Sequence, residues 1–79
     1  MNQPLVRMIG RRLKEQRKTL KLTQEDVERL SGVPQATISR IESGKTDDLQ
    51  VSTLRALALA LHLSTDDLLE LPAAVGARD

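Results

Sequence analysis

The stretch from Thr23 to Gly44 constrains the fold of this chain more than any other part of its sequence. Two short helical patterns, over 24–31 and 35–43, flank the tripeptide Gly32-Val33-Pro34. Glycine readily takes the left-handed backbone that ends a helix, and proline is favoured where the next helix starts, so these residues are expected to form a tight turn. Two helices of this length joined by a glycine-containing turn are typical of a helix-turn-helix.

The rest of the chain also has helical hydrophobic spacing. A helix is expected over about 5–20, and another over about 53–62 that carries a stripe at i, i+3, i+4 and i+7. A last short helix is expected from Ser64 or Thr65 to about residue 70. The chain is therefore predicted to be all-α, a compact five-helix domain over 1–71 with a short tail over 72–79.

The same patterns assign caps and core. Thr23 is the expected N-cap of the helix over 24–31, with Asp26 at the capping-box distance in place of the usual Glu or Gln, and Ser52 is the expected N-cap of the helix over 53–62. The residues expected to be buried are Ile9, Leu13, Leu20, Val27, Leu30, Val33, Ile38, Ile41, Leu54, Leu57, Ala58 and Leu61.

Composition excludes several classes of protein. The 79 residues suffice for one small domain, and with no cysteine and a single histidine there is no disulfide framework and no zinc site. Tyrosine is also absent, which leaves no pair of nucleophile and base for an enzyme, and no cofactor is expected. No apolar run approaches the length of a membrane span, so a soluble cytoplasmic protein is predicted.

The charges are distributed unevenly along the chain. Residues 1–24 hold seven basic residues against one acidic residue, a balance of +6, whereas residues 47–79 sum to −4. This asymmetry suits docking of one end onto a polyanion, with internal pairing of the charges as the alternative. Because Phe, Tyr and Trp are absent, the chain lacks the rings on which single-stranded nucleic acid is usually stacked, so duplex DNA is favoured over RNA.

Eight residues have a spacing that resembles the Xre-type, lambda-repressor-like (Cro-like) family of DNA-binding domains. They are Gln24, Val27, Gly32, Val33, Ile38, Ile41, Glu42 and Gly44, and the five-helix layout over about 9–71 is also similar. The resemblance implies a bacterial or phage transcription regulator, in the first place a repressor, that binds a duplex operator without chemistry. The alternative is an antitoxin or accessory protein that binds a protein partner and also its own promoter.

The helix over 35–43 is the predicted base-reading element. With Ile38 and Ile41 buried, its exposed flank consists of small and hydrogen-bonding side chains that fit a major groove about 12 Å wide. The predicted base-reading residues are Gln35, Ala36, Thr37, Ser39 and Arg40. Glutamine pairs with adenine, arginine with guanine, and a threonine methyl meets a thymine methyl. A merely solvated helix face is the alternative.

Further roles are implied by the resemblance. Gln24 would contact a phosphate and support Gln35, with helix capping as its alternative role, and Arg17 and Glu42 would form a structural ion pair. The predicted phosphate-binding residues are Gln24, Thr23, Lys45, Thr46 and Arg12, with Arg11 as the alternative to Arg12. A homodimer is expected because one module reads few base pairs. The residues assigned to this interface, or to one with a protein partner, are Leu59, Leu68, Leu71 and Val75. For Leu59 the alternative is a single exposed leucine without a partner, which is common on protein surfaces.

Several positions depart from the family pattern. Glu28 stands where alanine is usual, and it must turn outward or meet a base such as Arg40 or Arg17. Lys21 stands where glycine is common, and a left-handed backbone there costs roughly 1–2 kcal/mol relative to glycine. Asp47 and Asp48 lie in a loop that carries a basic residue for the minor groove in some relatives, so reading of the minor groove is not expected.

Overall fold

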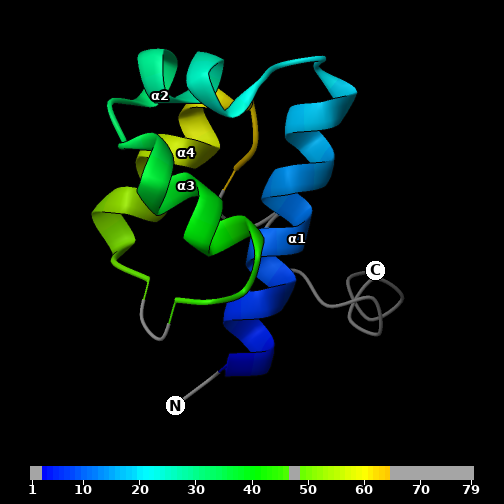
Figure 1. Ribbon diagram of the computed structural model, residues 1–79, viewed down its shortest axis with the longest axis vertical. Helices are drawn as coiled ribbons and strands as arrows, with labels where there is room; N and C mark the ends of the chain where they lie inside the picture. Colours follow the sequence, from blue (N-terminus) through cyan, green and yellow to red (C-terminus); the bar gives the residue numbers. More distant parts are fainter. Residues whose placement is uncertain (1–2, 47–48, 65–79) are drawn as a thin grey trace, which may run out of the picture.

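The computed structural model describes residues 3–46 and 49–64 of the chain. Four α-helices account for most of them: α1 over Gln3–Thr19, α2 over Gln24–Ser31, α3 over Gln35–Glu42 and α4 over Val51–Ala60. The long α1 runs along one side, and the three shorter helices are grouped beside it (Figure 1). The all-α prediction is confirmed for these residues, while the expected fifth helix lies almost entirely outside them.

One hydrophobic core joins the four helices. Its buried residues are Ile9, Leu13, Val27, Val33, Ile38, Ile41, Leu54, Leu57, Ala58 and Leu61. The predicted stripe of α4 is therefore confirmed, as are the α1 positions 9 and 13, while Leu20 is only partly buried against the core. No helix within residues 3–46 and 49–64 combines the length and apolar character that a bilayer-crossing segment requires.

The prediction that Leu30 is buried is wrong, because its side chain is 61% exposed. Leu30 lies in the last turn of an eight-residue helix, and about 60° round the helix axis from Val27. Val27 is the residue that α2 places in the core, at 1% exposure. A helix this short buries a narrow face, so hydrophobic character alone did not identify which of its residues face inward.

Two helix starts differ from the sequence-based expectation. α1 begins at Gln3 rather than near Leu5, with Pro4 in its first turn, where the missing backbone N–H costs no hydrogen bond. α4 begins at Val51, because the backbone N–H of Leu54 already donates to the Gln50 carbonyl at 3.0 Å. Ser52 therefore lies inside the helix, and the prediction that it is the N-cap is wrong. The ends of α3 and α4, at Glu42 and Ala60, fall one and two residues before those expected.

The turn between α2 and α3 follows the predicted chemistry. Thr23 caps α2 by accepting the backbone N–H of Asp26 at 3.0 Å, and the Asp26 carboxylate accepts the Thr23 N–H at 2.9 Å. These hydrogen bonds to Thr23 hold the pKa of Asp26 below its ordinary value. At the other end Gly32 has φ 79°, and its N–H donates to the Glu28 carbonyl. Pro34 then precedes α3 as its N-cap. The helix-turn-helix is thus present over 23–42.

Lys21, after α1, has the left-handed backbone that its position suggested, with φ 60°. We expect Lys21→Gly to raise the free energy of unfolding by about 1 kcal/mol, because glycine has no Cβ to strain this conformation. Chemical denaturation measures the change. Lys21→Ala is the matched control, since it removes the same charge and keeps the strain. An equal gain from alanine would show that the backbone conformation is not the cause.

Candidate nucleic-acid interface

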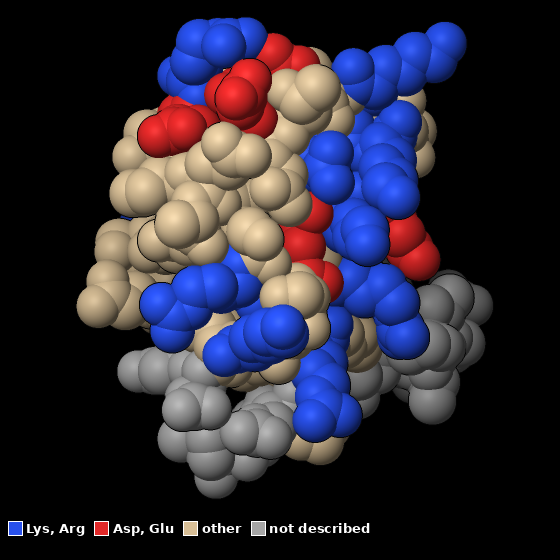
Figure 2. Space-filling view, in the orientation of Figure 1, with Lys and Arg blue, Asp and Glu red and all other residues tan. Residues whose placement is uncertain are grey.

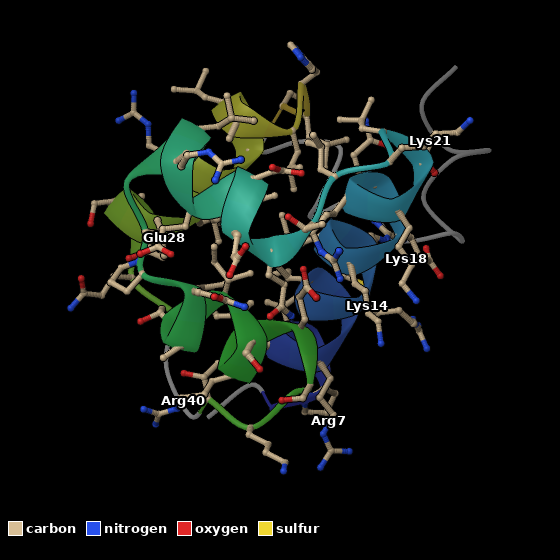
Figure 3. All side chains as sticks on the ribbon, turned by 45° about the horizontal axis from the view of Figure 1, so that its top comes forward. Arg7, Lys14, Lys18, Lys21, Glu28 and Arg40 are labelled. Atoms are coloured by element: carbon tan, nitrogen blue, oxygen red, sulfur yellow. The ribbon has the colours of Figure 1, made fainter. Side chains whose placement is uncertain are left out.

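The two sides of α3 differ in character. Ile38 and Ile41, each 2% exposed, anchor the inner side in the core. Gln35, Ala36, Ser39 and Arg40 are exposed on the outer side, and Thr37 is half-buried. The large exposed hydrophobic residues in the described ranges are Leu30, Val51 and Leu59, none of them on α3. Figure 3 shows the Arg40 side chain directed away from the helix into the surroundings. The predicted base-reading residues are therefore accessible, with Thr37 the least so.

A series of side-chain hydrogen bonds links the start of α3 to the interior. The Gln24 amide donates from Nε2 to Oε1 of Glu42 at 3.0 Å. Its own Oε1 accepts from Nε2 of Gln35 at 3.4 Å, which is a long hydrogen bond. Because Thr23 caps α2 and Gln24 bonds to Glu42 and Gln35, capping is not the role of Gln24. The first residues of α2 and α3 are held side by side.

The inner end of this series is the ion pair between Arg17 and Glu42. Arg17 donates from Nε to Oε2 at 2.7 Å and from one terminal nitrogen to Oε1 at 2.9 Å, so the contact is bidentate. The other terminal nitrogen donates to the Leu22 carbonyl at 2.8 Å. The side chains are 11% and 5% exposed. The hydrogen bond with Glu42 raises the already high pKa of Arg17. This pair joins α1, the turn before α2, and the end of α3.

Residues near the ends of α2 and α3 supply candidate phosphate contacts. Thr23 and Lys45 are exposed, whereas Arg12 and Thr46 are half-buried and each has an interaction within the protein. Arg11, beside Arg12, is exposed. Thr46 borders an open hollow of about 290 Å³ next to α3. The hollow is lined by Thr37, Ile41, Thr46, Leu49, Gln50 and Thr53. Lys45 is thus the predicted phosphate contact with the greatest freedom to reach a ligand, because Thr23, although exposed, is held in the capping box of α2.

Other predicted residues are placed as follows. Glu28 is exposed and turned outward, and it forms no ion pair with Arg40 or Arg17 in the described part of the chain (Figure 3). Leu59 is 76% exposed. Leu68, Leu71 and Val75 lie outside the described residues. Within the described ranges, no group of three or more His, Asp or Glu residues is arranged to hold a metal ion.

Gly10 is a packing position, next to the framework of the candidate site, that the sequence patterns did not indicate. It is buried in the middle of α1, and a Cβ added to it would lie 2.0 Å from the Ile41 carbonyl oxygen. The backbones of α1 and α3 therefore touch at this point, directly beside Glu42. The sequence signal that could have found it is a glycine inside a helical pattern, for which close packing against a neighbouring element is a common reason.

Comparison with known proteins agrees with this geometry. The helix-turn-helix family matches residues 13–68. An uncharacterized HTH-type transcriptional regulator, RghRB from Bacillus subtilis (strain 168), is 37% identical over 60 residues. These residues make up 76% of this chain and 43% of that relative, so the chain spans less than half of the relative's length. No solved structure gives a significant match.

The fold and the exposed flank of α3 define a DNA-binding domain of the helix-turn-helix class. The match covers well over half of the chain, and the chain belongs to this helix-turn-helix family, of the Xre or Cro-like type. This is a family of transcription regulators and not of enzymes.

Proposed function

We propose that this chain binds duplex DNA in a sequence-specific manner and represses transcription, with α3 lying in the major groove. The observation that carries the proposal is the hydrogen-bonded series from Arg17 through Glu42 and Gln24 to Gln35. It connects an exposed amide at the start of α3 to a bidentate ion pair whose side chains are largely buried. A reading side chain held in this way loses less conformational entropy when it meets a base.

The exposed flank of α3 supports specific roles for its residues. Gln35 pairs with the edge of an adenine, and Arg40 pairs with a guanine through two hydrogen bonds. Ala36 and Ser39 are small enough to let the helix approach the bases, and the Thr37 methyl meets a thymine methyl. Phosphates on the two sides of the groove are bound by Gln24 and Thr23 at the start of α2, and by Lys45 and Thr46 after α3, with Arg12 in support from α1.

Two substitutions separate base reading from phosphate binding. Gln35→Ala is expected to relax the preference at one operator position by about 1–3 kcal/mol, because a bidentate contact to one base is lost. Lys45→Ala is expected to weaken all duplexes alike and to reduce the salt dependence. Selection of bound duplexes from a random pool identifies the operator, and binding to its single-base variants measures the preference. If Gln35→Ala keeps the wild-type preference at every position, α3 does not read bases through its first turn.

A second copy of the chain completes the proposed operator complex. The eight residues of α3 span about 12 Å, so one module contacts only a few base pairs. Two copies on half-sites one helical turn apart extend the sequence that is read. The 76% exposure of Leu59 supports placing it in the dimer interface, together with Leu68, Leu71 and Val75. Sedimentation is expected to give two chains per operator duplex, and a monomer both free at high concentration and on DNA contradicts the dimer.

A further inference from the structure

Five basic residues repeat along α1 and its C-terminal turn at alternating intervals of four and three residues. They are Arg7, Arg11, Lys14, Lys18 and Lys21, which we call the basic stripe. The first four fall within about 60° of one another round the helix axis and extend for about 16 Å along it. Figure 3 shows Arg7, Lys14, Lys18 and Lys21 following one another along one side of α1. Of these residues, Arg11 alone is among the predicted phosphate contacts, as the alternative to Arg12.

The charges of the basic stripe face solvent. All five side chains are exposed. The ion pairs found in residues 3–46 and 49–64 are those of Arg17 with Glu42 and Arg29 with Asp26, so no residue of the stripe is neutralised there. The one acidic residue of α1, Glu15, lies about 40° beyond the edge of the stripe. Internal pairing within the described chain therefore does not account for the basic end of the molecule.

The basic stripe is continuous with the proposed DNA-binding face. The Arg7 side chain crosses Gly44, where an added Cβ would lie 3.1 Å from its Cγ. Gly44 follows Ser43, the C-cap of α3, and precedes Lys45. Arg7, the first residue of the stripe, therefore lies against the residue that precedes a predicted phosphate contact. In the space-filling view the basic side chains form a band from this region along α1 (Figure 2). The band flanks the surface that carries α3.

The chemistry of this surface favours a phosphate backbone over a protein. Protein interfaces generally gather their binding energy from buried aromatic or aliphatic anchors. The large exposed hydrophobic residues of the described ranges lie on α2 and α4, and α1 has none. A phosphate strand needs only cations at intervals, since each contact releases a condensed counterion. The basic stripe supplies cations at regular intervals, as a phosphate strand requires, and lacks the apolar anchors that a protein interface requires.

The separation of the α1 and α3 axes is comparable with the width of the major groove. With α3 in the groove, a phosphate strand would therefore lie beside α1. Packed helices have axes about 8–10 Å apart, and the Gly10 contact brings α1 against α3. The major groove is about 12 Å wide, so the strand that borders it lies at a comparable distance to the side of α3. On this basis, and resting on the proposed DNA-binding function, we infer that the basic stripe binds the sugar-phosphate strand bordering the groove, beyond the bases that α3 reads.

The salt dependence of binding tests this inference. The ligand is the duplex selected from the random pool, with flanking sequence on both sides. The variant is the triple substitution Arg11→Gln/Lys14→Gln/Lys18→Gln. The logarithm of the observed binding constant falls linearly with the logarithm of the salt concentration, with a slope of about 0.9 for each phosphate contact, so the loss of three contacts should make this slope shallower by about 2.7. The preference for the selected duplex over a scrambled duplex should stay at the wild-type value. Glutamine has a helix propensity close to those of lysine and arginine, so α1 is retained, and thermal unfolding checks this.

A matched pair of single variants separates position from net charge. Lys14→Gln and Arg55→Gln each remove one exposed positive charge, the first from the stripe and the second from α4. A reduction of about 0.9 in the slope is expected for Lys14→Gln alone. A wild-type slope in the triple variant, with sequence-specific binding intact, overturns the inference and leaves the proposed function standing. An acidic protein as the true partner of the stripe would give that result. Absence of specific duplex binding by the wild type overturns both.

Discussion

Gly10→Ala is expected to lower the free energy of unfolding by about 3 kcal/mol, at the upper end of the cost of overpacking a core. In an ordinary helix this change would have the opposite sign, since alanine is favoured over glycine by about 1 kcal/mol. At position 10 the new Cβ would lie 2.0 Å from the Ile41 carbonyl oxygen and 3.0 Å from its carbon. Backbone atoms cannot rotate away as a flexible side chain can, so α1 and α3 must separate.

Denaturant unfolding of Gly10→Ala measures this loss, and Gly32→Ala serves as the control. An added Cβ at Gly32 meets nothing within 4 Å, so its cost comes only from the backbone at φ 79° and is about 1–2 kcal/mol. The expected order of stability is wild type, then Gly32→Ala, then Gly10→Ala. A Gly10→Ala protein as stable as the wild type would mean that the two helices do not touch at this point.

The helix-turn-helix was the part of the fold most accessible from sequence. The bounds of α2 agree with the expected range, because Thr23 and Gly32 each determine the local backbone through a short-range interaction. Thr23 supplies a capping oxygen, and Gly32 takes a left-handed φ of 79°. Such signals act within a few residues and need no knowledge of the tertiary packing.

Features that depend on packing between helices were less accessible. The burial of Val27 and the exposure of Leu30 depend on where α4 and α3 meet α2, which hydrophobicity does not specify. The start of α4 was misplaced because Ser52 offers a capping hydroxyl that the structure does not use. The contact at Gly10 joins two backbones 31 residues apart, and a single glycine in a helical pattern has several explanations.

The candidate site was predictable mainly through resemblance to a family. Periodicity placed Gln35 and Arg40 on the outer flank of α3 once Ile38 and Ile41 were assigned to the core. It gave no indication that Gln24 lies between Glu42 and Gln35. That position depends on the angle between α2 and α3, and hence on the core. The basic stripe was visible as an excess of charge, but its exposure and its continuity with Gly44 required the structure.

Glu42→Ala is expected to lower the free energy of unfolding by about 3–5 kcal/mol, the typical cost of removing one partner from a buried ion pair. The Arg17 side chain, which is 11% exposed in the wild type, would keep its charge, and of its present hydrogen-bond acceptors in the described residues the Leu22 carbonyl alone would remain. The Gln24 amide would lose its acceptor as well. Because α3 is then held less firmly, the variant should lose stability before its base preference changes. Unfolding and operator-variant binding, measured together, check the order.

Adding Arg17→Met to Glu42→Ala distinguishes an unpaired charge from a lost contact. If the cost of Glu42→Ala arises mainly because the Arg17 guanidinium remains buried without its carboxylate, the double variant should be more stable than Glu42→Ala alone. Methionine fills similar space and carries no charge, and replacing both members of a buried pair is often close to neutral. The single variant Arg17→Met completes the comparison. If the loss of stability in the double variant equals the sum of the losses in Arg17→Met and Glu42→Ala, the two residues are not coupled. A fully stable Glu42→Ala protein with altered base preference would place Glu42 among the base-reading residues and remove it from the framework that positions α3.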